Sequence, residues 1–313
     1  MPPEAKDISA APLSQVDKPV ALVLGGGGAR GMAHMGVFKA LEEERVPVDM
    51  IVGTSICALG ASLYGLSRDW RFLKERTVEF LNSKGFKKYG KGLTEDVSGR
   101  ARRANPIKTF LKKAGALVLL AARKSLVSHG RLREAVDGLV PDKRFDDLLV
   151  PLAVVALDLK TCEEVVIREG SLRDACALSA NLAGFFPPQS SGGKLIVDPS
   201  PVSSVPVDIA RSVGAAAVIA VDVRSKLEPI DGIASGVDAA FRVAAIASDR
   251  ANETQIARAD VVITPGVAGT YWSDFRDVDA HIAEGERAAQ EAMPEIRRVL
   301  EGLGRSGGGT AEE

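Results

Sequence analysis

Two kinds of hydrophobic pattern alternate along this chain. Short runs rich in β-branched and other apolar residues are typical of buried strands, whereas apolar residues three or four positions apart are typical of helices. Strands are predicted over residues 19–24, 49–52, 152–157, 164–167, 195–197, 217–223 and 261–264. Helices are predicted over residues 32–44, 57–66, 172–179, 207–213, 237–258 and 280–303. This alternation predicts an α/β fold, a three-layer α/β/α sandwich with a mainly parallel sheet covered by helices on both faces.

The pattern fades at both ends of the chain. Residues 1–17 and 304–313 are rich in polar residues, proline or glycine, and we expect them to be flexible tails. The folded domain is therefore expected to span residues 18–303. With 46% apolar residues, the chain has ample material for a buried core.

Residues 84–133 differ in charge from the rest of the chain. They carry fourteen Lys or Arg against only Glu95 and Asp96, and they enclose the apolar run 114–122. Basic residues around an apolar helix suit an element that contacts anionic lipid headgroups. A basic helical insertion or lid, packed on the core by its apolar side, explains the same pattern. Both interpretations stay open.

The overall composition excludes several classes of protein. A formal net charge of −1 gives no general attraction to nucleic acid. The three cysteines, Cys57, Cys162 and Cys176, are widely spaced and odd in number, which favours reduced thiols over a disulfide frame or a metal site. No apolar run approaches the roughly 20 residues of a membrane span, and the first 18 residues contain no signal-like apolar segment. We expect a cytoplasmic protein without cofactor or metal, which can still contact membrane surfaces.

Ser55 is the first candidate for chemistry. Residues 51–57 read Ile-Val-Gly-Thr-Ser-Ile-Cys, so the serine lies between a predicted strand and a predicted helix. A serine on a tight strand-to-helix turn is the sequence form of a nucleophile elbow, in which the hydroxyl projects free of its own backbone.

A glycine-rich loop precedes Ser55 by about one strand and one helix. Residues 26–31 match G-x-G-x-x-G, which by itself is typical of dinucleotide binding as well. The dinucleotide fold also needs an acidic residue at the end of the second strand, where this chain has residues 53–55 instead. A tight turn without a ligand is a further explanation. Beside Ser55, however, the loop is well placed to aim backbone N–H groups at an oxyanion, and Arg30 adds either a positive charge for an anion or a structural ion pair.

A nucleophilic serine needs a base. The histidines, His34, His129 and His281, do not follow predicted core strands, and we interpret them as packing or surface residues. Asp198 ends the predicted strand 195–197 and precedes a turn and a helix, as Ser55 does. A carboxylate can accept the serine proton directly when partial burial tunes its pKa. A turn or N-cap aspartate is the alternative interpretation.

Taken together, these motifs resemble the patatin-like phospholipase family, in particular its bacterial stand-alone members. The resemblance runs from about Val20 to Val223 and more loosely to about residue 300. It rests on residues 26–31 (Gly-Gly-Gly-Ala-Arg-Gly), 53–55 (Gly-Thr-Ser), 185–188 (Phe-Phe-Pro-Pro), Asp198 and 205–208 (Val-Pro-Val-Asp).

The resemblance implies a three-layer hydrolase fold that cleaves acyl esters of phospholipids and related lipids with a Ser–Asp dyad and no histidine. It implies that Ser55 is the nucleophile and Asp198 the base. The N–H groups of Gly27, Gly28 and Ile56 would form the oxyanion hole. Gly26, Arg30, Gly31 and Gly53 would support the two motifs.

Three positions depart from the family pattern. The serine motif G-x-S-x-G has Cys57 at its last position, and the aspartate motif D-G-G or D-G-A reads Asp198-Pro199-Ser200. Proline fixes its own φ near −65°, lacks an N–H and favours extended geometry at Asp198. These departures motivate a second hypothesis, a catalytically weak or inactive protein of the same fold that acts in lipid binding or regulation.

Overall fold

The computed structural model describes residues 15–86 and 127–305. The outer parts of the predicted tails and most of the basic segment 84–133 lie outside these ranges. Within the described residues, no helix is long and apolar enough to cross a membrane.

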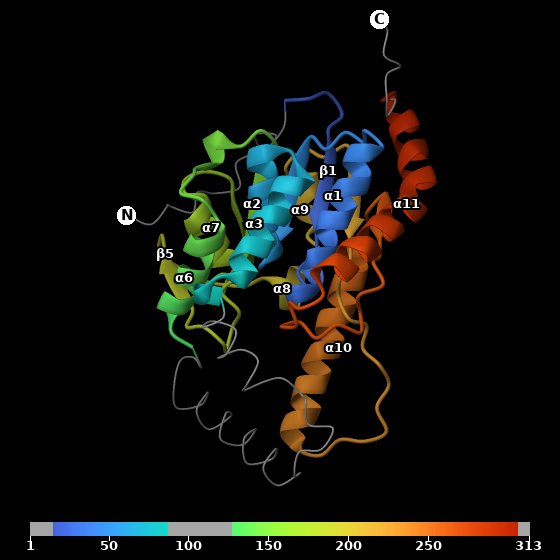
Figure 1. The fold of residues 1–313 in the computed structure, drawn as a ribbon. Helices are drawn as coiled ribbons and strands as arrows, with labels where there is room; N and C mark the ends of the chain where they lie inside the picture. The colour runs from blue at the N-terminus through green and yellow to red at the C-terminus, as the bar shows by residue number, and fades with distance from the viewer. Residues whose placement is uncertain (1–14, 87–126, 306–313) are drawn as a thin grey trace, which may run out of the picture.

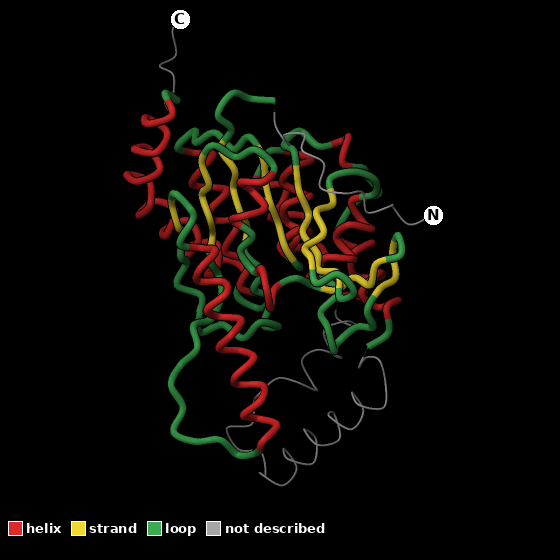
Figure 2. Tube along the Cα trace, turned by 180° about the vertical axis from the view of Figure 1, so that it is seen from behind, coloured by secondary structure: helices red, strands yellow, loops and turns green. Residues whose placement is uncertain are grey.

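An eight-stranded sheet forms the centre of the molecule (Figures 1 and 2). Its strand order is β5-β6-β3-β2-β1-β7-β8, with β4 also paired to β3. The parallel part contains β1 (Val20–Leu24), β2 (Met50–Thr54), β3 (Leu152–Asp158), β7 (Ala217–Val221) and β8 (Val261–Ile263). The antiparallel pairings are made by β4 (Glu163–Ile167), β5 (Gln189–Ser191) and β6 (Lys194–Val197). The predicted mainly parallel α/β fold is confirmed.

Helices cover both faces of this sheet (Figure 1). The larger core contains residues from α1 (Ala33–Glu43), α2 (Cys57–Ser67), α3 (Trp70–Asn82), α6 (His129–Leu139), α7 (Leu172–Ser179) and α11 (Val278–Leu303). The opposite core contains α9 (Val207–Ser212), with the end of α10 (Gly236–Ile256) packed against it. Short elements are α8 (Ser200–Ser203) and the 3-10 helices η1 (Gly28–Met32) and η3 (Phe145–Asp147).

The strand β1 shows why the sequence builds two cores. All five of its residues are buried, and successive side chains point to opposite faces. Leu22 and Leu24 belong to the larger core, while Ala21 and Val23 belong to the smaller one. A run that is apolar at every position is therefore the pattern expected of a strand covered on both sides.

Two helices, α3 and α6, are absent from the predicted elements. Their apolar positions are interrupted by many charged residues, and in α3 only Leu73 is fully buried. The helix α3 begins at a side-chain cap, in which Asp69 accepts a hydrogen bond of 2.8 Å from the Arg71 amide. These helices pack on the outside of the larger core, where a weaker hydrophobic pattern suffices.

The helices α1 and α11 approach each other through two glycines. A Cβ at Gly36 would lie 1.9 Å from the carbonyl oxygen of Ile282, and a Cβ at Gly285 would lie 1.9 Å from that of Ala33. Any larger residue at either position would separate the helices, because backbone atoms cannot move aside as a flexible side chain can.

We therefore expect Gly285→Ala to lower the free energy of unfolding by about 1–3 kcal/mol through overpacking. Gly302→Ala is a matched control in the same helix, because nothing lies within 4 Å of a Cβ there. That control should raise stability by up to about 1 kcal/mol through helix propensity. Urea unfolding of both variants measures the difference, and equal stabilities would contradict the close packing.

Candidate active site

Ser55 lies on a strained turn between β2 and α2. Its φ is +57°, a left-handed value that costs energy for a residue with a side chain. Gly53 lets the chain fold back this tightly, because even a Cβ there would lie 3.1 Å from the Cα of Ala58. The structure therefore has the elbow geometry that the sequence predicts for Ser55.

Ser179, at the end of α7, holds this turn in place. The Ser55 amide donates a hydrogen bond of 2.8 Å to the Ser179 hydroxyl, which in turn donates one of 2.6 Å to the carbonyl of Val155 in β3. Sequence reasoning missed Ser179, because a serine within a predicted helix carries no signal of a contact 124 residues away.

Asp198 reaches Ser55 by an unexpected route. The sequence predicts that the strand before Asp198 is followed by a turn and a helix, as β2 is before α2. In the structure, however, β6 runs antiparallel to β3. Val155 pairs with both β2 and β4, and Leu157 pairs with both β4 and β6. Since a strand has only two edges, β2 and β6 share one edge of β3. β6 therefore pairs with the part of this β3 edge that lies beyond the end of β2. As a result, Ser55 after β2 and Asp198 after β6 lie near each other.

The Asp198 carboxyl is almost fully buried, with 2% of the residue exposed. Burial raises its pKa above the ordinary value, while hydrogen bonds from the Ser200 and Ser55 hydroxyls and the Ser200 amide act in the opposite direction. The Ser55 hydroxyl is therefore close enough to the Asp198 carboxyl to influence its pKa. A carboxyl with a raised pKa is suited to accept and return a proton.

Pro199 does not misdirect this carboxyl. With φ −82° and ψ −7° it adopts helical geometry and precedes α8. The amide of Ser200, one residue further on, donates a hydrogen bond of 2.8 Å to Asp198 Oδ1. Ser200 therefore supplies the N–H that proline lacks.

The glycine loop lies beside the elbow and is fixed from several sides. The Gly25 amide bonds to the Val221 carbonyl at 3.0 Å, and the Gly26 amide bonds to the Ser204 carbonyl at 2.9 Å. Gly28 has φ +63°, and a Cβ there would lie 2.2 Å from the carbonyl oxygen of Trp272. Only glycine fits this position. As the first residue of η1, Gly28 has no acceptor for its amide within that helix.

Gly27 differs from its neighbours, because its amide is directed at the Cys57 thiol. Burial raises the pKa of this thiol to about 12, so it stays protonated at neutral pH. The Cys57 sulfur also fills the space beside Gly31, where a Cβ would lie 2.6 Å from it. The Cys57 thiol thus engages the Gly27 amide, one of the N–H groups predicted to bind the oxyanion.

Arg30 joins the glycine loop to two other loops. Its Nε donates to the Val223 carbonyl at 2.8 Å and its Nη1 to the Thr270 carbonyl at 3.1 Å. Burial lowers the pKa of its guanidinium, whereas Cys57 and Asp222 act to raise it. Its hydrogen bonds thus go to backbone carbonyls, in place of the ion pair that we considered.

The histidines form no described contact with Ser55. His281 is buried and bonds to the Asp277 carbonyl and the Thr270 hydroxyl. His129 begins α6. His34 is buried in α1 and borders a pocket.

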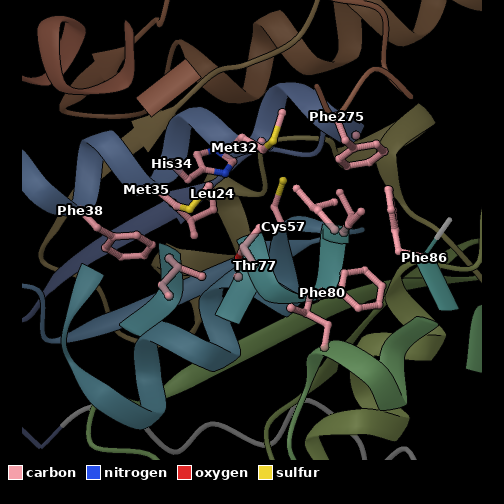
Figure 3. Close-up of a pocket in the computed structure, with 17 residues that line it drawn as sticks. Leu24, Met32, His34, Met35, Phe38, Cys57, Thr77, Phe80, Phe86 and Phe275 are labelled. Carbon is pink, nitrogen blue, oxygen red and sulfur yellow. The ribbon is translucent and has the colours of Figure 1, made fainter. Parts of the chain in front are cut away.

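This pocket starts beside the elbow and lies between α1, α2 and α3 (Figure 3). Gly28, Ile56 and Cys57 line it next to the candidate nucleophile, and its volume is about 70 Å³. Further lining comes from apolar side chains, among them Met32, Met35, Phe38, Leu73, Phe80 and Phe275. An apolar cavity beside a serine suits an acyl chain.

Comparison with known proteins agrees with this geometry. Residues 22–211 match the family model of the patatin-like phospholipases. This chain belongs to that family. It is 34% identical over 211 residues to patatin-like phospholipase domain-containing protein 6 of Homo sapiens, covering 67% of this chain and 14% of that protein.

One further relative and one solved structure extend the comparison. An NTE family protein of Mycobacterium tuberculosis is 25% identical over 304 residues, covering 88% of this chain and 47% of the relative. Among solved structures, VipD from Legionella pneumophila has a TM-score of 0.47 at 14% identity, covering 90% of this chain and 67% of that one. With 14% of its mammalian relative covered, this chain spans only a fraction of the length of the mammalian relatives it matches.

The charged Asp198 carboxylate should lower the free energy of unfolding at neutral pH. Because its pKa is raised in the folded state, the folded protein holds this proton more tightly than the unfolded chain does, and stability falls as pH rises above about 3.8. We expect Asp198→Asn to be about 1 kcal/mol more stable than the parent at pH 7.5, with the difference shrinking as pH falls toward 4. Urea unfolding at several pH values measures this, and a less stable variant at pH 7.5 would contradict the raised pKa.

Proposed function

We propose that this protein is a serine acyl hydrolase that acts on phospholipids or related lipid esters. The observation that carries the proposal is the left-handed turn at Ser55, beside a buried Asp198 carboxyl whose pKa the Ser55 hydroxyl acts to lower. Membership of the patatin-like phospholipase family and the apolar pocket beside the elbow support a lipid substrate.

In the acylation step, Asp198 accepts the proton of the Ser55 hydroxyl while Ser55 Oγ attacks the ester carbonyl carbon. The Gly28 and Ile56 amides stabilise the resulting oxyanion. The Gly27 amide joins them when it turns away from the Cys57 thiol. Collapse of this intermediate breaks the bond to the alcohol, which takes the proton from Asp198. Ser55 is left carrying the acyl group as an ester.

Deacylation repeats these steps with water. Asp198 takes a proton from the water, whose oxygen attacks the acyl carbonyl, and Ser55 Oγ leaves with that proton. The free fatty acid is released. No histidine takes part, which agrees with the hydrogen bonds of His281 to Asp277 and Thr270.

A second function is favoured by one observation. The Gly27 amide is directed at the Cys57 thiol and away from the oxyanion site. Losing one oxyanion donor costs roughly 100-fold or more in rate in serine hydrolases. A slow hydrolase that binds lipid in a regulatory role is consistent with this contact. Contact with anionic membranes through residues 84–133 remains a further proposal, which falls mostly outside the described residues.

The first experiment tests the nucleophile. We expect a fluorophosphonate probe to label the purified protein, and p-nitrophenyl esters of short and long acyl chains to be hydrolysed. Ser55→Ala should abolish both, because the nucleophilic oxygen is removed, whereas Ser190→Ala, at an exposed position of β5, should change neither. An unlabelled parent protein with an intact circular dichroism spectrum would refute the hydrolase.

The second experiment tests the thiol. Both Cys57→Ala and Cys57→Gly release the Gly27 amide, and we expect each to raise kcat by up to about 100-fold with little change in KM. The alanine variant separates the release of the amide from the added backbone freedom of glycine. Cys176→Ala, which removes a buried thiol bonded to Ala58 and Ser62 away from the loop, is the control. Unchanged kcat in both Cys57 variants would show that the thiol does not limit the reaction.

A further inference from the structure

His34 is a buried polar side chain without a partner. Only 4% of the residue is exposed, and its Nε2 atom is shielded from solvent without a hydrogen bond. Nδ1 likewise forms no hydrogen bond with a described residue. Burial lowers the pKa of the imidazole to about 3, so the ring is neutral at pH 7.

An unsatisfied polar atom of this kind is costly. Leaving a buried donor or acceptor without a partner costs about 1–3 kcal/mol, and such groups in native proteins call for an explanation. The other buried histidine, His281, has partners for both of its ring nitrogens. The Nε2 atom of His129 is also buried without a partner, but among the described histidines only His34 lines the pocket.

The His34 ring lies in the wall of the pocket that is proposed to hold the acyl chain of the substrate. His34 lines the apolar pocket from α1, facing α2 and α3 across the cavity (Figure 3). A Cβ placed on Gly31 would lie 2.6 Å from the Cys57 sulfur and 3.6 Å from His34 Nδ1, so these two groups are neighbours. Cys57 is only two residues from Ser55. The ring therefore lies near the end of the pocket that adjoins the nucleophile.

The neutral ring limits what the ligand group can be. A charged group would have to enter an apolar cavity without a counter-ion, which is strongly unfavourable. A hydroxyl both donates and accepts, so it satisfies the imidazole in either tautomer. Thr77 also lines the cavity, from α3. The pocket thus combines an apolar wall for methylene groups with a polar atom near its entrance.

We propose that His34 is a specificity-determining residue, and that the preferred substrates are esters whose acyl chain carries a hydroxyl group close to the ester carbonyl. This inference rests on the proposed hydrolase function, because it identifies the pocket as the acyl site. A site that hydrogen-bonds a hydroxyl discriminates strongly against the analogue that lacks it, since its own polar group is then left unpaired.

Binding to the Ser55→Ala variant tests this inference apart from catalysis. The probes are ethyl octanoate, ethyl 3-hydroxyoctanoate and ethyl 8-hydroxyoctanoate, with affinities measured by isothermal titration calorimetry. We expect the 3-hydroxy ester to bind about tenfold or more tightly than the other two. His34→Phe in the same background should bring the three affinities within about twofold, and His34→Gln, which keeps a hydrogen-bonding group, should restore part of the preference.

A spectroscopic measurement covers the case in which these variants do not fold. In the Ser55→Ala protein with ¹⁵N-labelled histidine, the 3-hydroxy ester should shift an imidazole nitrogen resonance of His34 more than ethyl octanoate does. Equal affinities of the three esters, or equal shifts, would overturn the role of His34. The proposed hydrolase is judged separately by fluorophosphonate labelling of Ser55, which does not depend on the acyl chain.

Discussion

The left-handed turn at Ser55 is the constraint on which the rest of the site depends. A residue with a side chain adopts this conformation only where its surroundings hold it there. Here the surroundings are specific: the Ser179 hydroxyl bridges the Ser55 amide to the β3 carbonyl of Val155, and Gly53 leaves room for α2 to pack against β2. The helix α7 and the strand β3 thus fix the position of the hydroxyl that the proposed reaction uses.

The second part of the site is stabilised differently. Asp198 is buried with hydrogen-bonding groups around its carboxyl but without a cation among its described hydrogen-bond partners. That arrangement favours reactivity over stability, because burial disfavours the charged form in the folded state. Ser200 limits the cost by directing its amide at Oδ1. A Pro-Ser pair after the aspartate is therefore compatible with an oriented carboxyl, although proline itself donates no hydrogen bond.

The sequence predicted the parts of this protein that depend on local pattern. The buried strands, most of the helices and the elbow at Ser55 follow from apolar runs, helical spacing and the position of small residues. The strand direction before Asp198 did not follow, because direction is set by which edge of β3 is open, a property of the assembled sheet. The contact of Ser179 with Ser55 and the position of the Cys57 thiol beside the glycine loop were equally hidden, since each brings together segments that are distant in the sequence. The role of Arg30 as a link between loops was hidden for the same reason.

The shared edge of β3 has a consequence for the order of events during folding. β2 brings Ser55 to that edge, whereas Asp198 arrives with the β5–β6 hairpin, more than a hundred residues later in the chain. Pairing of β1, β2 and β3, with α7 docked so that Ser179 holds the Ser55 amide, is enough to form the turn, but it places no carboxylate beside the serine. The proposed pair of Ser55 and Asp198 is therefore complete only in a chain whose β5–β6 hairpin has docked on β3.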